Sequence, residues 1–109
     1  MKIPNPSPIV SNANMANAVT SSLIIPQRNY GYSVQASWTT AGTLGGVLKL
    51  QISLDGLIWN DLENSSQTLT GNGSFTWIIQ AYAVCYGYAQ LVYVPAVGDS
   101  GVLNAICNL

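Results

Sequence analysis

The stretch Tyr30-Gly-Tyr-Ser-Val-Gln-Ala-Ser-Trp38 decides the fold class of this chain. Every even-numbered position in it is apolar, and every odd-numbered position is Gly, Ser or Gln. Because successive side chains of a strand point to opposite faces of a sheet, a period of two is typical of a strand with one buried face. The stretch therefore predicts a half-buried β-strand.

The same alternation returns a few residues later, over Val47 to Leu54. Here Leu48, Leu50, Ile52 and Leu54 are expected to face inward, and Lys49, Gln51 and Ser53 outward. Asp55-Gly56 follows, a pair that is typical of two-residue hairpin turns because it tolerates positive φ angles. The sequence thus predicts a β-hairpin that returns through Leu57 to Leu62.

Further turns and strands fill the C-terminal half of the chain. Gly71-Asn72-Gly73 predicts a turn before an alternating strand that contains Phe75, Trp77 and Ile79, and Pro95 ends a strand over Tyr86 to Val94. Residues 97–101 predict a third turn, and residues 102–109 a last strand. No segment of ten or more residues keeps a helical period. Six or seven short strands predict an all-β fold, an antiparallel β-sandwich or jelly roll over residues 30–109.

Residues 1–29 differ from the rest of the chain. Alternate prolines at positions 4, 6 and 8 fix φ and remove backbone donors, which favours an extended N-terminal arm. Within this part, Ala18 to Ile25 is a candidate first or edge strand that stops at Pro26. An arm of about 25 residues at roughly 3.1 Å per residue would reach some 70 to 80 Å.

Charge is the most informative feature of the composition. Only 6% of the 109 residues are charged, against about 25% in an ordinary soluble domain. Lys2, Arg28 and Lys49 are too few to neutralise phosphates, so we expect no nucleic-acid partner and no anionic membrane partner. The start of the chain has no apolar run typical of an export signal, so we expect a cytosolic protein.

Catalytic and metal chemistry has little support in the sequence. The chain has no His, and Asp61 and Glu63 are more simply solvated carboxylates than a glycosidase pair or calcium ligands. Cys85 and Cys107 fit no metal-binding spacing; we expect buried thiols, with a single bridge or a reactive thiol as alternatives. We therefore expect no enzyme, no cofactor and no metal.

Ten aromatic residues leave two interpretations open. Trp38 and Trp77 alternate with other inward residues and are most simply core, whereas Trp59 could be core or exposed. Tyr86 and Tyr88 are expected on one face and Tyr93 on the other, together with Tyr82 in the same row. Tyr has an apolar ring and a polar tip, which suits packing or protein interfaces and, less simply, sugar binding.

Three segments carry a resemblance to a known family: residues 32–38, which end in Trp38; residues 42–62, with the hairpin motif Leu-Lys-Leu-Gln-Ile-Ser-Leu-Asp-Gly-Leu-Ile-Trp59; and Gly73-Ser-Phe-Thr-Trp77. From about Tyr30 to the C-terminus the chain resembles small β-sandwich virion proteins of tailed phages, which are similar to jelly-roll decoration (cement or staple) proteins of icosahedral capsids. The two cysteines are not part of that pattern.

The resemblance implies a structural virion protein that binds the major capsid protein and copies of itself, bridges neighbouring capsid subunits and stabilises the shell. It implies a place on the capsid surface after assembly in the host cytoplasm. Low charge and high apolar content also agree with a protein that packs against others. The expected partner-binding residues are the apolar ones of the arm: Ile3, Pro4, Pro6, Pro8, Ile9, Val10, Leu23 and Ile24. The alternatives are a carbohydrate-binding sandwich module, with a glycan partner, and a tail-associated component.

Overall fold

The structure is a computed structural model that describes residues 6–27 and 29–109. Its elements are β1 (Ser7–Asn14), β2 (Val19–Thr20), β3 (Tyr32–Thr39), β4 (Val47–Ser53), β5 (Asn60–Asp61), β6 (Gln67–Thr68), β7 (Gly73–Ile79), the 3₁₀ helix η1 (Ala81–Ala83), β8 (Tyr88–Val94) and β9 (Val102–Asn108). The prediction of an all-β chain is confirmed. Several of the strands are only two residues long, which is why the described part holds more of them than the six or seven predicted.

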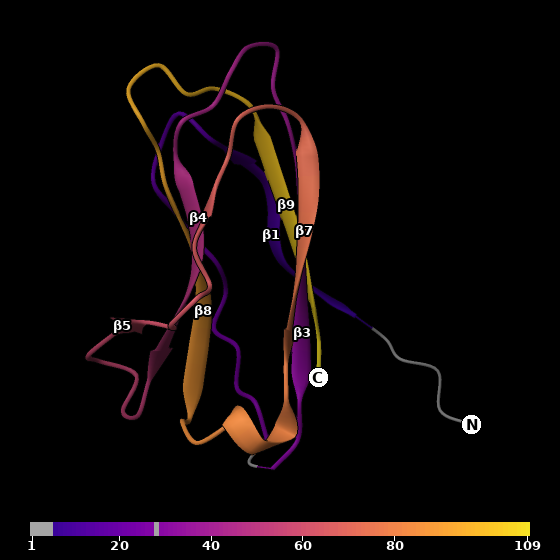
Figure 1. Cartoon of the computed structure of the whole chain (residues 1–109), viewed down its shortest axis with the longest axis vertical. Helices are drawn as coiled ribbons and strands as arrows, with labels where there is room; N and C mark the ends of the chain where they lie inside the picture. The colour runs from indigo at the N-terminus through magenta and orange to yellow at the C-terminus, as the bar shows by residue number, and fades with distance from the viewer. Residues whose placement is uncertain (1–5, 28) are drawn as a thin grey trace.

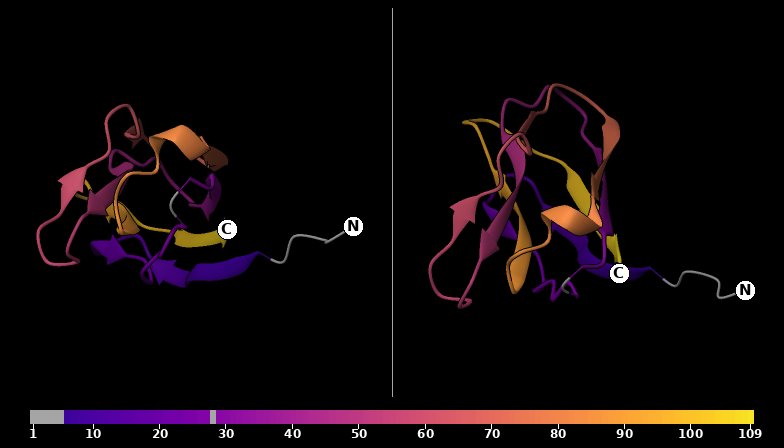
Figure 2. Two further views of the ribbon diagram at one scale, coloured as in Figure 1. Left: turned by 90° about the horizontal axis from the view of Figure 1, so that it is seen from below. Right: turned by 60° about the horizontal axis from the view of Figure 1, so that its bottom comes forward.

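The strands form two antiparallel sheets that pack face to face (Figures 1 and 2). Sheet A has the order β1-β9-β3-β7, and sheet B has the order β2-β8-β4-β5, with β6 also paired to β4. The antiparallel β-sandwich is thus confirmed, with the chain crossing between the sheets at most connections. The narrower jelly-roll prediction is compatible with these orders and stays a prediction.

The core lies between the two sheets and is built from the inward positions of the long strands. Val34, Ala36, Leu48, Leu50 and Tyr93 have no exposed surface. In β3, the even-numbered residues Tyr32 to Trp38 are all buried, as the alternation predicts. β3 pairs with β7 and with β9 over seven residues each, so the deciding stretch is one of the two inner strands of sheet A.

The predicted hairpin forms, but its turn is wider than two residues. β4 pairs with β5 through Gln51↔Asp61 and Ile52↔Asn60, which leaves a six-residue connection from residue 54 to residue 59. Of the Asp55-Gly56 pair, only Gly56 has a positive φ, of 79°.

The side chains at the start of this turn reverse the predicted pattern. Leu54 is exposed and Ser53 is buried, because the Ser53 hydroxyl accepts hydrogen bonds from the Asp55 and Gly56 N–H groups. The Asp55 carboxylate in turn accepts the N–H groups of Leu57 and Ile58. The alternation therefore ends at Ile52, two residues earlier than the sequence predicts.

The expected arm over residues 1–29 is corrected for its described residues, 6–27. β1 pairs with β9 along one edge of sheet A, and Ile9, Val10 and Met15 are buried in the common core. Pro8 lies in this edge strand and beside a register shift, which are positions where a sheet tolerates proline. The boundary at residue 30 is therefore wrong for residues 6–27, and residues 1–5 lie outside the described part.

The candidate edge strand at residues 18–25 is confirmed as two short pairings with β8. Val19 pairs with Tyr93 in β2, and Ile24 forms an isolated bridge with Ala89. Backbone hydrogen bonds from Ser22 to Ile9 and from Ser21 to Leu91 connect this segment to both sheets. The segment therefore links the sheets at one side of the sandwich.

Candidate interaction surface

The outer face of sheet A is a continuous surface without a charged side chain in the part of the chain that the structure describes. The positions that point away from the core are Ser33, Gln35 and Ser37 of β3, Ser74, Thr76 and Ile78 of β7, and Val102, Asn104, Ile106 and Asn108 of β9. They are exposed or half-buried, and all are small polar or aliphatic residues. We call this surface the neutral face.

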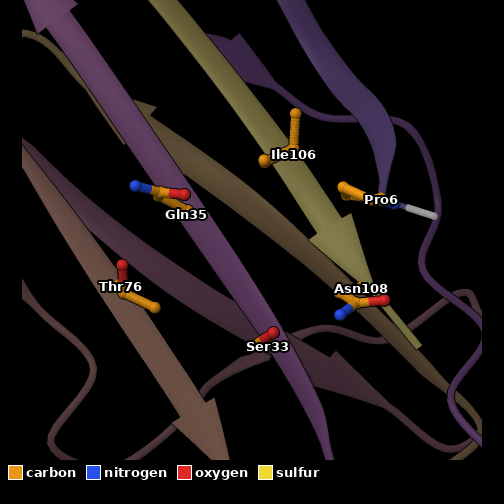
Figure 3. Close-up of a pocket in the computed structure, with 6 residues that line it drawn as sticks. All are labelled: Pro6, Ser33, Gln35, Thr76, Ile106 and Asn108. Atoms are coloured by element: carbon orange, nitrogen blue, oxygen red, sulfur yellow. The ribbon is translucent and has the colours of Figure 1, made fainter. Parts of the chain in front are cut away.

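A shallow hollow of about 350 Å³ lies on the neutral face (Figure 3). Its lining residues come from neighbouring strands and from the residue before β1: Pro6, Ser33, Gln35, Thr76, Ile106 and Asn108. Figure 3 shows their side chains spread across one side of the sheet rather than enclosing a deep site. The hollow offers hydroxyl, amide and aliphatic groups, which suits a neutral protein surface better than an ion or a phosphate.

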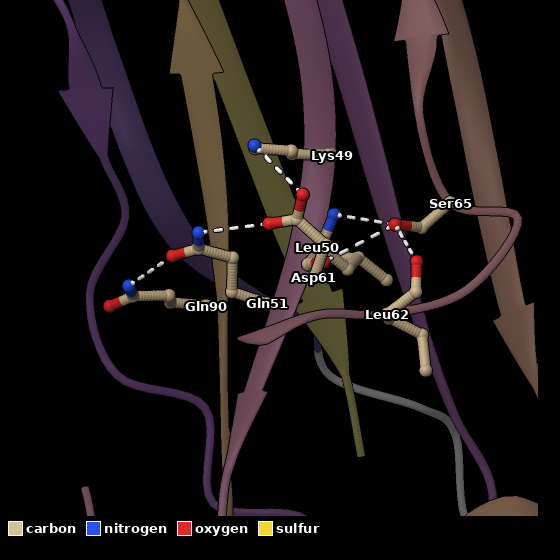
Figure 4. A network of polar contacts seen from close by, with 7 residues as sticks. All are labelled: Lys49, Leu50, Gln51, Asp61, Leu62, Ser65 and Gln90. Atoms are coloured by element: carbon tan, nitrogen blue, oxygen red, sulfur yellow. Dashed lines mark hydrogen bonds and ion pairs between the residues drawn. The ribbon is translucent and has the colours of Figure 1, made fainter. Parts of the chain in front are cut away.

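The outer face of sheet B is different, because its polar side chains are bonded to one another (Figure 4). Lys49 and Asp61 form an ion pair at 3.0 Å, Gln51 donates to Asp61 at 3.1 Å, and Gln90 donates to Gln51 at 2.9 Å. The hydrogen bond from Gln51, and then the one from Lys49, holds the pKa of Asp61 below its ordinary value. These polar side chains on the outer face of sheet B are thus hydrogen-bonded to one another.

The polar side chains of the hollow make no comparable network. Within residues 6–27 and 29–109, no side-chain hydrogen bond involves Ser33, Gln35, Thr76 or Asn108. Their donors and acceptors are therefore available to water or to a partner. This difference between the two outer faces makes the neutral face the candidate interaction surface.

The structure separates the predicted partner-binding residues. Pro6 and Pro8 are exposed, and Pro6 lines the hollow on the neutral face. Ile9, Val10 and Ile24 belong to the core and are not available to a partner, which corrects that prediction. Leu23 is 49% exposed, on the segment between the sheets. Ile3 and Pro4 lie outside the described residues.

The sequence contains a signal for the neutral face in the outward positions of two strands. The odd-numbered positions of residues 32–39 and the even-numbered positions of residues 73–79 are the outward ones, and none of them is charged. What the sequence could not give is that β7 and β9 lie on either side of β3, which joins these positions into one surface.

Two of the four carboxylates hold loops in place. Asp99 is buried and accepts the N–H groups of Gly45, Gly46 and Ala96 and the hydroxyl of Tyr93. These bonds, that of Tyr93 first, lower the pKa of Asp99 below its ordinary value. The carboxylate of Asp55 has a lowered pKa for the same reason, with the N–H of Ile58 as the first cause.

The Asp61 and Glu63 pair is not held on one strand face, because β5 ends at Asp61 and Glu63 lies in the following turn. In the described ranges, no three His, Cys, Asp or Glu side chains gather closely enough to hold a metal ion. Asp55 and Asp99 therefore hold loops, and Asp61 takes part in a surface ion pair.

The aromatic side chains mostly build the core. Trp38 and Trp77 are buried, and their indole N–H groups donate to the carbonyls of Gly71 and Ser65. Tyr32 and Tyr86 share a hydrogen bond of 2.7 Å between their hydroxyls, and burial raises the pKa of both.

Other aromatic positions and the cysteines divide between core and surface. Tyr82 is 88% and Tyr30 65% exposed, and Trp59 and Tyr88 are half-buried, so a stacking surface for a sugar would have to come from such positions. Both thiols are free: Cys107 is buried, which raises its pKa to about 11, whereas Cys85 is exposed. The expectation of two buried thiols is thus wrong for Cys85.

Comparison with family models, with curated proteins and with solved structures gave no match for this chain. Among the described residues, no helix has the length and apolar character needed to cross a bilayer.

Proposed function

We propose that this protein is a structural virion protein of the capsid-decoration type, which packs the neutral face against subunits of a protein shell. The observation that carries the proposal is the absence of charge from that face, which extends over the three neighbouring strands β9, β3 and β7. The family resemblance of residues 30–109 supplies the virion setting.

Desolvation explains why a neutral face favours a protein partner. A charged group loses its hydration when an interface forms, and this cost often exceeds what a new ion pair returns. Hydroxyl and amide groups lose less, and interface cores are accordingly depleted of charged residues. A chain in which only 6% of residues are charged, and whose neutral face carries none of them in the described part, matches that composition.

The corrected N-terminus changes how such a protein would bridge subunits. With residues 7–14 paired in sheet A, a strap of about 25 residues is no longer available. Contact would instead come from the rigid neutral face, with Pro6 at its border leading into residues 1–5. On a repeating shell, many modest contacts of this kind add up through multivalency.

The test is the number of copies of the protein in purified virus particles, measured by quantitative mass spectrometry. Hundreds of copies per particle support decoration of the shell. A handful of copies would instead support the tail-associated alternative, and absence from particles would overturn the proposal. A glycan array on the purified protein addresses the carbohydrate alternative, which would need binding that Trp59→Ala abolishes.

A pair of matched variants connects this test to the neutral face. Gln35→Lys places a charge at the hollow, whereas Gln90→Lys makes the same change on the outer face of sheet B. We expect Gln35→Lys to lose its association with particles and Gln90→Lys to keep it. Equal association of the two variants would show that sheet A is not the contact.

A further inference from the structure

The two edges of sheet A differ in how well they are protected against pairing with another chain. At one edge, β1 contains Pro8 and has register shifts between Pro8 and Val10 and between Val10 and Ala13. Prolines and bulges are devices that keep an edge strand from pairing further. The β1 edge is therefore blunted.

The opposite edge, β7, has none of these devices. Its sequence Gly73-Ser-Phe-Thr-Trp-Ile-Ile79 has no proline and no charge, and it pairs with β3 over seven residues without a register shift. Among the described residues, its backbone is hydrogen-bonded to β3 alone. Alternate N–H and C=O groups of β7 consequently point away from the sheet without a strand partner.

The remaining edge strands in the described part are too short to offer a comparable site for pairing with a strand of another chain. β2, β5 and β6 on sheet B have two residues each. β7 is thus the long, regular and uncharged edge of the molecule, and the geometry points to strand pairing there as a function of this protein.

We propose that β7 pairs antiparallel with β7 of a second copy of this chain, which joins the two A sheets into one continuous sheet across a two-fold axis. The register that pairs all seven residues puts the middle residue, Thr76, opposite Thr76 of the second copy. On the inner face it puts Phe75 opposite Trp77 of the second copy. Thr–Thr and aromatic pairs are among the favourable cross-strand pairs.

A second copy fits this edge better than an unrelated strand for two reasons. The strand carries no charge, so two identical strands do not repel each other. The blunted β1 edge leaves one open edge per molecule, so pairing closes after one step and gives a dimer rather than a fibre. The dimer would carry a neutral face twice as wide, but the inference does not rest on the proposed virion role.

Analytical ultracentrifugation of the purified full chain at high micromolar concentration tests the proposal. The wild-type protein is expected to sediment at twice the 11.6 kDa of one chain. Thr76→Lys is expected to raise the dissociation constant at least tenfold, because two like charges would meet on the two-fold axis. Sedimentation of the wild-type protein as a monomer would overturn the proposal, and so would a Thr76→Lys variant that stays dimeric.

Gln35→Lys separates edge pairing from face-to-face packing. Gln35 lies beside Thr76 on the same face, one strand away from the open edge. The Gln35→Lys variant should stay dimeric if the β7 edges pair. Dissociation of this variant would show that the neutral faces, and not the edges, form the dimer. In the particle test the same variant is expected to lose its association with particles. Failure of the dimer and failure of the proposed function are therefore distinguishable.

A crosslink checks the register even where the lysine variant fails to fold. Directly opposite residues of antiparallel strands have Cα atoms about 4.5 to 5.5 Å apart, within the reach of a disulfide. In a Cys85→Ser background, Thr76→Cys is expected to form a disulfide-linked dimer under mild oxidation. Ser11→Cys, an exposed position on the blunted β1 edge, should not. Equal crosslinking at both positions would contradict pairing through β7.

Discussion

Met15 offers a direct test of whether the N-terminal residues belong to the sandwich. Its side chain has no exposed surface, and its N–H donates to the Gly101 carbonyl at 3.0 Å. Met15→Ala keeps that backbone bond and removes three buried heavy atoms. At roughly 0.8 kcal/mol for each buried CH₂-sized group, the transfer cost is about 2.4 kcal/mol.

The cavity left behind adds to this figure, so the full loss in the free energy of unfolding is expected at about 2–5 kcal/mol. At about 4 °C per kcal/mol for a domain of this size, Tm should fall by roughly 8–20 °C. Urea unfolding followed by tryptophan fluorescence measures the change, because Trp38 and Trp77 lie in the same core.

The matched control is Leu23→Ala, at a residue from the same part of the chain that is 49% exposed. Leu23→Ala should lower the free energy of unfolding by only about 1 kcal/mol, because roughly half of the side chain is already in water and no enclosed cavity is left. If Met15→Ala changes the unfolding free energy by less than about 0.5 kcal/mol, as surface substitutions usually do, the N-terminal residues are an arm after all.

Three further predictions concern buried polar groups. Ser65→Ala should cost about 1–3 kcal/mol in urea unfolding, because it leaves the buried N–H of Leu50 unpaired, whereas exposed Ser66→Ala should be neutral. The pKa of Asp99 lies below its ordinary value of 3.8, so the contribution of its carboxylate to the free energy of unfolding is present above pH 3.8 and is lost as the pH falls through the lowered pKa. In an acid titration of stability, Asp99→Asn should lack this loss. Burial, and then Asp99, raises the pKa of Tyr93 above 10, so stability should be full below pH 10 and fall above it, and Tyr93→Phe should flatten that fall.

The sequence predicts the long strands well, because alternation is a local property. Residues 32–39 and 73–79 need only the period of two and the turns beside them. The turn after Ser53 is the exception, since a serine hydroxyl that bonds to the following N–H groups is buried in spite of being polar. A hydrophobic pattern alone cannot anticipate such local bonds.

The N-terminus shows a second limit of sequence reasoning. Alternate prolines favour extended backbone, and extended backbone is equally suited to a free arm and to an edge strand. Pairing of residues 7–14 with β9 depends on contacts between residues 88 to 100 positions apart in the chain, which no local pattern contains. The buried Asp99 was missed for the same reason, because its partners Gly45 and Gly46 are more than 50 residues away.

The candidate surface was predictable in its parts but not as a whole. Uncharged outward positions can be read from each strand, yet the order β1-β9-β3-β7 decides that they form one face. Ile9, Val10 and Ile24 were wrongly assigned to partner binding, because burial against the protein's own core and burial against a partner favour the same residue types.

The central claim is that the neutral face binds other subunits of a particle, and copies per particle test it most directly. Quantitative mass spectrometry of purified virus particles should find hundreds of copies of the wild-type chain and of Gln90→Lys, but few of Gln35→Lys. Particles without the protein, or particles that carry Gln35→Lys and the wild-type chain in equal number, would contradict the account.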